Sequence, residues 1–144
     1  MTHFSSILTK LVESDNFQCF EKVVDYLLSH QLLKINYKDS SKSTSVIWEE
    51  PLCRAIKLYK DDIFEYSLNK MEICSFSQIT PFVHSCAKYG NIRAFFILFH
   101  RSLIVLGMSN NFTAEFFNLL INNHFYHFLQ VGYRINNKQP IDFR

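Results

Sequence analysis

Residues 80–100 read TPFVHSCAKYGNIRAFFILFH and predict two short helices that are separated by a glycine turn. Thr80 is a residue type that caps helix N-termini, Pro81 suits a first helical turn, and Gly90 can adopt the positive φ that ends a helix. Beyond Gly90, apolar residues have the i, i+3, i+4 spacing of one helix face: Phe95, Leu98 and Phe99. This helix–turn–helix unit decides the fold class, because the rest of the chain contains weaker copies of it.

The composition of the 144-residue chain is that of a folded helical protein. Apolar residues make up 48% and charged residues 19%, which excludes a disordered segment. The three glycines and three prolines are too few for a chain with many tight β-turns. Fifteen Phe and seven Tyr predict an aromatic core, with some rings left over for recognition. The net charge of +2 indicates no concentrated basic face, so we expect no nucleic-acid partner.

The sequence also lacks the signals of secretion and of membrane insertion. Its first residues, MTHFSS, have no basic region followed by an apolar region, and the four cysteines form no C-x-x-C pair. The most apolar run, 94–107, is interrupted by His100 and Arg101 and is too short to span a bilayer. We therefore expect a cytoplasmic or nuclear protein with reduced thiols and no membrane partner.

Helical spacing extends on both sides of residues 80–100. On the N-terminal side, we predict a helix over 3–13 and a second over 16–31, whose cap would come from Ser14 or Asp15. Its inward stripe would comprise Phe20, Val24, Leu27 and Leu28. The Ser- and Lys-rich residues 32–45 predict a loop.

Three further helices follow from the same reasoning. Glu49-Glu50-Pro51 would open one, with acids near its positive N-terminal end and with an inward stripe of Leu52, Ala55 and Ile56. The next would bury Ile63, Phe64, Ser67 and Leu68. A last pair would cover 113–122, starting at Thr113, and 123–130, ending at Gly132.

The second helix of each predicted pair repeats one pattern. Four segments align without gaps, and their starts are 40, 31 and 30 residues apart: VVDYLLSH from Val23, IFEYSLNK from Ile63, AFFILFHR from Ala94 and HFYHFLQV from His124. A recurrence of 30 to 33 residues is typical of a solenoid. The longer first interval fits an insertion of the Ser- and Lys-rich loop.

Three stretches resemble motifs of the ankyrin-repeat family. EPLCRAI at 50–56 is similar to the family's Thr-Pro-Leu-His-x-Ala-Ala start, and AKYGN at 87–91 to its Ala-x-x-Gly-Asn turn. FLQVGYRIN at 128–136 is similar to its Leu-Leu-x-x-Gly-Ala-x-Ile-Asn ending. The chain departs from the family where Tyr59 replaces a turn glycine and where Phe116-Phe117 occupies the two-alanine site.

The resemblance implies an all-α fold, an ankyrin-like helical-repeat solenoid of about four helix-turn-helix units. The whole chain, 1–144, would form a single domain with repeats at about 3–45, 46–76, 77–109 and 110–144. In the family, the His at the position of His84 hydrogen-bonds the turn.

No motif in the chain indicates catalysis. His84 and Cys86 are two residues apart and point to different helix faces, so we expect a hydrogen-bonded His and a buried Cys. His124 and His127 could share a face, but they lack a third zinc ligand at a defined spacing. We expect no metal, no cofactor and no enzymatic activity, with a zinc or thiol enzyme as the least favoured alternative.

The predicted function is protein–protein interaction, as an adaptor or inhibitor that binds a partner protein through the loop tips and first helices of the repeats. Phe96, one residue off the inward stripe, would join the docking surface if it is not core. The alternative is a structural module that forms a homodimer through its excess Phe and Tyr. The candidate partner-binding residues lie near repeat starts or turns: Trp48, Glu49, Glu50, Lys57, Tyr59, Lys88 and Tyr89.

Overall fold

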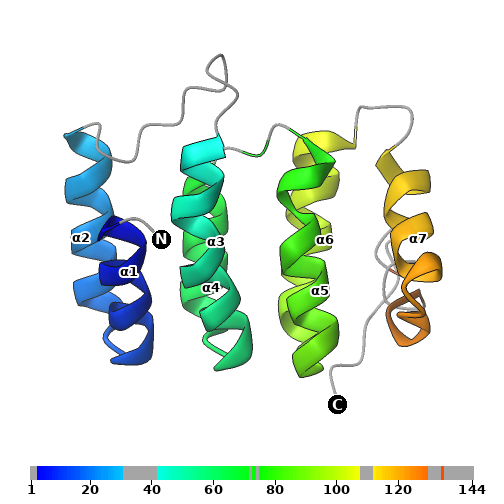
Figure 1. The fold of residues 1–144 in the computed structure, drawn as a ribbon, viewed down its shortest axis with the longest axis horizontal. Helices are drawn as coiled ribbons and strands as arrows, with labels where there is room; N and C mark the ends of the chain where they lie inside the picture. The colour runs from blue at the N-terminus through cyan, green and yellow to red at the C-terminus, as the bar shows by residue number, and fades with distance from the viewer. Residues whose placement is uncertain are drawn as a thin grey trace. The chain divides into compact units, whose positions relative to one another are not determined.

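The structure is a computed structural model that describes residues 3–30, 42–71, 73, 75–107, 112–129 and 134. Every regular element in these residues is helical, which confirms the predicted all-α class. Residues 126–129 add a short helical segment. The elements (Figure 1) are α1 (His3–Glu13), α2 (Phe17–Ser29), α3 (Lys42–Lys57), α4 (Asp61–Lys70), η2 (Phe76–Gln78), α5 (Thr80–Tyr89), α6 (Ile92–Leu106) and α7 (Phe112–Asn122).

The chain divides into two compact units, Met1–Glu72 and Ile73–Arg144, which we call the N-terminal and C-terminal units. The division lies near the predicted boundary between the second and third repeats. In the N-terminal unit, α1 packs against α2 and α3, and α3 packs against α4. In the C-terminal unit, α5 contacts η2 and α6, and α6 contacts α7. Each unit is therefore built from helix pairs joined by short turns.

The first two helices follow the predicted pattern closely. The predicted helix 3–13 coincides with α1. Helix α2 begins at Phe17, because Asn16 is its cap and the Asn16 side-chain oxygen accepts a hydrogen bond from the Cys19 N–H at 3.0 Å. The expected caps Ser14 and Asp15 were therefore wrong. Of the predicted inward stripe, three residues are buried, Phe20, Val24 and Leu27, and Leu28 is half-buried.

Helix α3 corrects the prediction that a helix opens at residues 49–51. It begins at Lys42, so residues 42–45 of the predicted loop are helical, and Pro51 lies inside the helix. Pro51 has no N–H to donate to the carbonyl of residue 47, but burial of the helix stabilises it in spite of this loss. The predicted stripe of Leu52, Ala55 and Ile56 is buried, as is that of Ile63, Phe64, Ser67 and Leu68 in α4. The rest of the predicted loop lies outside the described residues.

The C-terminal unit has the aromatic core that the composition predicts. The rings of Phe95 and Phe128 stack with centroids 4.3 Å apart, and Phe99 meets Phe116 edge-on at 4.4 Å. All four side chains are fully buried. Aromatic pairs in such geometries contribute about 0.5–1.5 kcal/mol each beyond the burial of their area. These rings therefore bind α6 to α7 and to the helical segment that follows α7.

Two predicted helix starts in this unit are shifted. Thr80 is the first residue of α5 and not its cap, and its hydroxyl donates back to the Phe76 carbonyl at 3.3 Å. Thr113 is the second residue of α7, which begins at Phe112. By contrast, Asn91 caps α6 and accepts a hydrogen bond from the Ala94 N–H at 2.9 Å. Gly132, the predicted end of the last helix, lies outside the described residues.

The same backbone turn joins the two helices of every described pair. One residue of each turn has a positive φ between 59° and 67°: Asp15, Tyr59, Gly90 and His124. In three of the turns, the next N–H donates to the carbonyl five residues back, at 2.8–2.9 Å, from Lys60 to Ala55, Asn91 to Cys86 and Phe125 to Leu120. This is the hydrogen bond of a Schellman motif, which satisfies the last carbonyls of the first helix.

The turns correct the predicted alignment of the repeats. Their positive-φ residues are 44, 31 and 34 residues apart, whereas the aligned second helices are 40, 31 and 30 apart. The first and last intervals thus differ by four residues between the two alignments. Counted from the turns, Phe20, and not Val24, is equivalent to Phe64 and Phe95. Because an apolar helix stripe repeats after nearly four residues, a shift of one turn leaves the sequence pattern matched.

The left-handed turn predicts opposite effects of glycine at two positions. Gly90→Ala should lower the free energy of unfolding by about 1–2 kcal/mol through backbone strain alone, because its new Cβ would meet nothing within 4 Å. At residue 59, Tyr59→Gly should be more stable than Tyr59→Ala by about 1 kcal/mol, since both variants lose the ring and only Gly tolerates the turn. Urea unfolding measures both differences, and equal stabilities at residue 59 would contradict a left-handed Tyr59.

Candidate partner-binding surfaces

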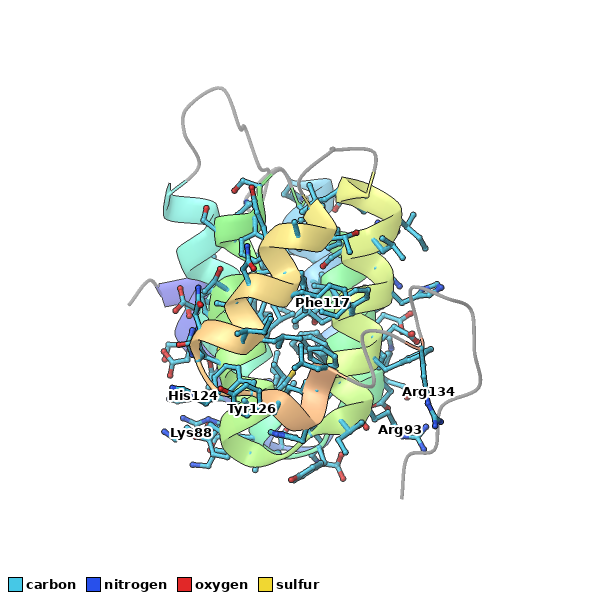
Figure 2. All side chains as sticks on the ribbon, turned by 90° about the vertical axis from the view of Figure 1, so that its right-hand side faces the viewer. Lys88, Arg93, Phe117, His124, Tyr126 and Arg134 are labelled. Atoms are coloured by element: carbon cyan, nitrogen blue, oxygen red, sulfur yellow. The ribbon has the colours of Figure 1, made fainter. Side chains whose placement is uncertain are left out.

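Two turns of the C-terminal unit lie together and form one exposed surface. The ring of His84, in α5, packs edge-on against Phe125 after α7, with centroids 5.4 Å apart. Lys88, His124 and Tyr126 are exposed and lie near one another (Figure 2). We call this set the C-terminal turn surface: His84, Lys88, Tyr89, His124 and Tyr126.

Local contacts order the side chains of the C-terminal turn surface. The Nδ1 atom of His124 lies 2.7 Å from the Tyr126 hydroxyl, and the two rings meet edge-on at 5.5 Å. The Lys88 Nζ atom lies 5.3 Å from the centroid of the Tyr89 ring, a cation–π distance. Tyr126 nevertheless leaves 54% of its surface exposed. An ordered and exposed tyrosine is suited to binding, because little side-chain entropy remains to be lost.

The N-terminal unit has a corresponding surface at the end of α3, formed by Lys57, Leu58 and Tyr59, which we call the N-terminal turn surface. Tyr59 is 56% exposed and Leu58 is 37% exposed. Lys60, which follows this turn, pairs with Asp15 of the preceding turn, with Nζ and Oδ1 2.5 Å apart. Lys60 is half-buried, but Asp15 is exposed, and surface ion pairs contribute only about 0–1 kcal/mol, so the pair links neighbouring turns and adds little stability.

Three of the seven predicted binding residues lie away from the turns. Trp48 was expected in a loop, but it lies within α3 and its side chain is completely buried. It therefore belongs to the core, with Leu52 one helical turn further along. Glu49 is exposed and Glu50 is half-buried, both in the middle of α3, because that helix starts at Lys42.

The other four predicted residues fall on the two turn surfaces: Lys57, Tyr59, Lys88 and Tyr89. Glu50 and Lys57 are seven residues apart and so share one face of α3. The structure adds four residues that were not among the predicted binding residues: Leu58, His84, His124 and Tyr126. A correct alignment of the second helices would have placed His124 at the turn, in the position of Tyr59 and Gly90, and Tyr126 near it. The predicted alignment was wrong by one helical turn in the last pair, so it did not identify these two residues.

The described residues offer little for catalysis or metal binding. No group of three His, Cys, Asp or Glu side chains among them could hold a metal ion. Cys86 is buried, as predicted, and His84 is exposed, with its ring against Phe125. A hollow of about 380 Å³ runs along α2, lined by polar and apolar side chains: Asn16, Gln18, Cys19, Lys22, Val23 and Tyr26.

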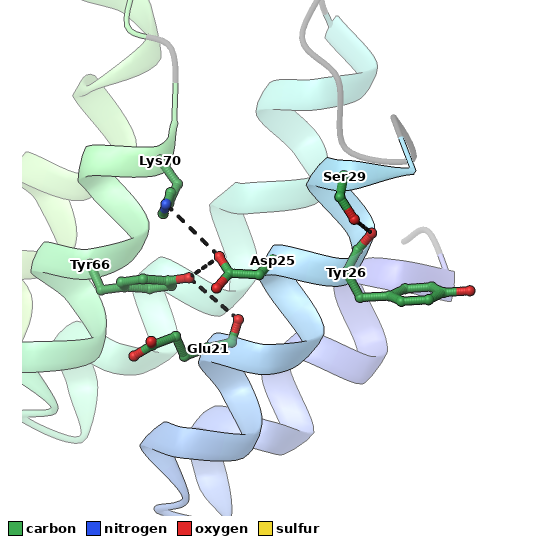
Figure 3. A network of polar contacts seen from close by, with 6 residues as sticks. All are labelled: Glu21, Asp25, Tyr26, Ser29, Tyr66 and Lys70. Atoms are coloured by element: carbon green, nitrogen blue, oxygen red, sulfur yellow. Dashed lines mark hydrogen bonds and ion pairs between the residues drawn. The ribbon is translucent and has the colours of Figure 1, made fainter.

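A polar network ties α2 to α4 in the N-terminal unit (Figure 3). The Tyr66 hydroxyl donates to the Asp25 carboxylate at 2.7 Å and lies 3.4 Å from the Glu21 carbonyl oxygen. Lys70 approaches both partners, with its Nζ 3.9 Å from Asp25 and 5.4 Å from the Tyr66 ring centroid. The ring also packs edge-on against Phe17 and Phe20, at 5.6 and 6.2 Å.

This network holds a proton and does not release one. Burial raises the pKa of Tyr66 above its usual value, and the hydrogen bond to Asp25 and the charges of Asp25 and Glu21 raise it further. A phenol with a raised pKa is a poorer acid and is not a nucleophile at neutral pH. The network is therefore a structural link between the two helix pairs of this unit.

Comparison with protein-family models gives no match to the chain, and comparisons with curated proteins and with solved structures give none either. None of the helices in the described part of the chain is both long enough and apolar enough to cross a membrane.

The raised pKa of Tyr66 predicts how stability depends on pH. Folding holds the proton on the phenol, so this stabilisation is complete below about pH 10, the usual tyrosine pKa. It is lost as the pH rises above that value, because the unfolded state then releases the proton. Tyr66→Phe should cost about 1 kcal/mol at neutral pH, the worth of one hydrogen bond, and less at alkaline pH.

Urea unfolding at about pH 8 and about pH 11, which bracket the usual tyrosine pKa, tests this prediction. The gap between wild type and Tyr66→Phe should narrow at the higher pH. Tyr26→Phe is the matched control, since Tyr26 is 58% exposed and its variant should unfold like wild type at both values. A gap that stays constant would mean that Tyr66 titrates normally in the folded protein.

Proposed function

We propose that the chain is a protein–protein interaction module, an adaptor or inhibitor that binds its partner through the two turn surfaces. The observation that carries this proposal is the exposure of a tyrosine at a fixed turn in each unit. Tyr59 is 56% exposed and Tyr126 is 54% exposed. Tyrosine is among the residues that contribute most to protein interfaces, because it offers a large rigid ring and a polar hydroxyl.

We further propose that the four helix pairs stack as an ankyrin-like solenoid. The recurring left-handed turn supports this, since repeats of one supersecondary unit bury their apolar faces against their neighbours. The pairing of Lys60 with Asp15, from successive turns, is the kind of contact that such stacking produces. In a solenoid, the turns of all four pairs would lie along one edge and form one extended binding surface.

Residual dipolar couplings of backbone N–H groups test the solenoid. If the two units form one rigid array, a single alignment tensor should fit the helices of both. Couplings from α1 to α4 and from α5 to α7 that require two tensors of different magnitude would show units that move independently. The turn surfaces would then act separately, and the continuous-edge proposal would be wrong.

Alanine substitutions test the binding surfaces. Tyr59→Ala and Tyr126→Ala should each reduce recovery of partner protein from the native cell by about tenfold or more, the effect of an interface anchor. Tyr26→Ala is the matched control, because Tyr26 is 58% exposed but lies on α2 away from the turns. Affinity purification with quantitative mass spectrometry measures the recovery.

If both turn variants recover as much partner as the control, the turn surfaces are not the binding site. The homodimer alternative, which uses the excess Phe and Tyr, would then rely on other exposed rings, such as Tyr26 at 58% exposure. The molar mass of the purified chain separates the alternatives, since a mass that stays monomeric at rising concentration excludes the homodimer.

A further inference from the structure

The described residues of the C-terminal unit carry an excess of positive charge. They contain four Lys and Arg residues, Lys88, Arg93, Arg101 and Arg134, but one acid, Glu115. The described residues of the N-terminal unit have the opposite balance, with nine Asp and Glu against seven Lys and Arg. The net charge of +2 for the whole chain conceals this asymmetry.

The positive charge in the C-terminal unit extends to its turn surface. Lys88 precedes the turn at Gly90 and is exposed on this surface, whereas Arg93, which follows the same turn, lies on the other side of the unit (Figure 2). Glu115 lies in the first turn of α7, roughly 10 Å along that helix from its other end, where His124 and Tyr126 lie. The acid is therefore remote from the turn surface.

The polar atoms of the C-terminal turn surface favour carboxylate ligands. The Lys88 ammonium group can pair with a carboxylate, and the exposed rings of His84 and His124 carry N–H groups that can donate to one. The Tyr126 hydroxyl and His124 Nδ1 share a hydrogen bond of 2.7 Å, so the neutral pair offers a carboxylate one free donor, and the Tyr126 ring adds apolar area. Figure 2 shows Lys88, His124 and Tyr126 gathered at one end of the unit.

We propose that the C-terminal turn surface binds an acidic segment of the partner protein, one that carries several Asp or Glu residues next to apolar side chains. This inference rests on the proposed function and names the chemistry of the partner. Charge complementarity of this kind speeds association and selects the partner, whereas the tyrosine supplies contact area.

Nucleic acid fits the surface less well. Binding to a phosphate backbone depends on many Lys and Arg contacts, typically about 6–10. The described residues of the unit offer four Lys and Arg in total, and Arg101 lies near the C-terminal end of α6. A second copy of the chain could also present acids from its N-terminal unit, so self-association must be measured in the same experiment.

The test uses the full chain and three labelled probes: a twelve-residue peptide of alternating Glu and Leu, its Lys and Leu counterpart, and a single-stranded oligonucleotide. Fluorescence anisotropy should show binding of the Glu peptide alone, weakened by added salt. Lys88→Glu should reduce the affinity by at least tenfold, and Lys88→Gln by less. Lys10→Glu is the matched control, because Lys10 is exposed on α1 and its variant has the same net charge as Lys88→Glu.

Equal binding of the Glu and Lys peptides, or tighter binding of the oligonucleotide than of the Glu peptide, would overturn the inference. Equal losses of affinity in Lys88→Glu and Lys10→Glu would also overturn it. So would a molar mass that doubles with concentration, because the surface would then bind the acidic N-terminal unit of a second copy. Thermal unfolding of Lys88→Gln and Lys88→Glu confirms that both remain folded. If the peptide fails to bind while Tyr126→Ala still loses the native partner, the acidic chemistry is wrong but the proposed binding surface is not.

Discussion

The left-handed residue between the helices of each pair is the constraint on which the rest of the structure depends. It reverses the chain within three or four residues, so that two helices can bury their apolar stripes against each other. Gly90 adopts this conformation without strain, whereas Asp15, Tyr59 and His124 each bear a cost of about 1–2 kcal/mol. Burial of the helix faces must offset that cost, and the turn therefore persists because the tertiary structure requires it.

The two units meet this requirement with different side chains. The N-terminal unit buries Trp48, Phe20 and Phe64 together with aliphatic residues, and it adds the polar link from Tyr66 to Asp25 at its edge. The C-terminal unit relies on Phe rings in contact, with Phe95 and Phe99 of α6 at the centre. One backbone plan is thus compatible with two kinds of core, because rows of helix side chains interlock by shape more than by residue type.

The turns also explain why the exposed chemistry lies where it does. The turns end the first helices at the surface, where exposed side chains such as Tyr59 and Lys88 lie. Within each unit, one contact ties a helix pair to the next: Lys60 with Asp15 in the N-terminal unit and His84 with Phe125 in the C-terminal unit. Binding surfaces built on such turns are positioned by rigid helices, which is how loops often acquire function.

The sequence by itself determined the helical class and most inward stripes, since apolar spacing, Asn91 and Gly90 are local signals that packing reinforces. It also pointed to four of the residues on the turn surfaces. Only the tertiary structure decided that α3 starts at Lys42, because the end of a Ser- and Lys-rich stretch becomes helical, and Pro51 is tolerated inside the helix, once Trp48 and Leu52 are buried. The tertiary structure also decided how the helix pairs align, because an apolar stripe that recurs at every helical turn does not show at which turn the helix begins. It decided the positive φ of His124 as well, because a strained backbone conformation persists only where the surrounding structure holds it.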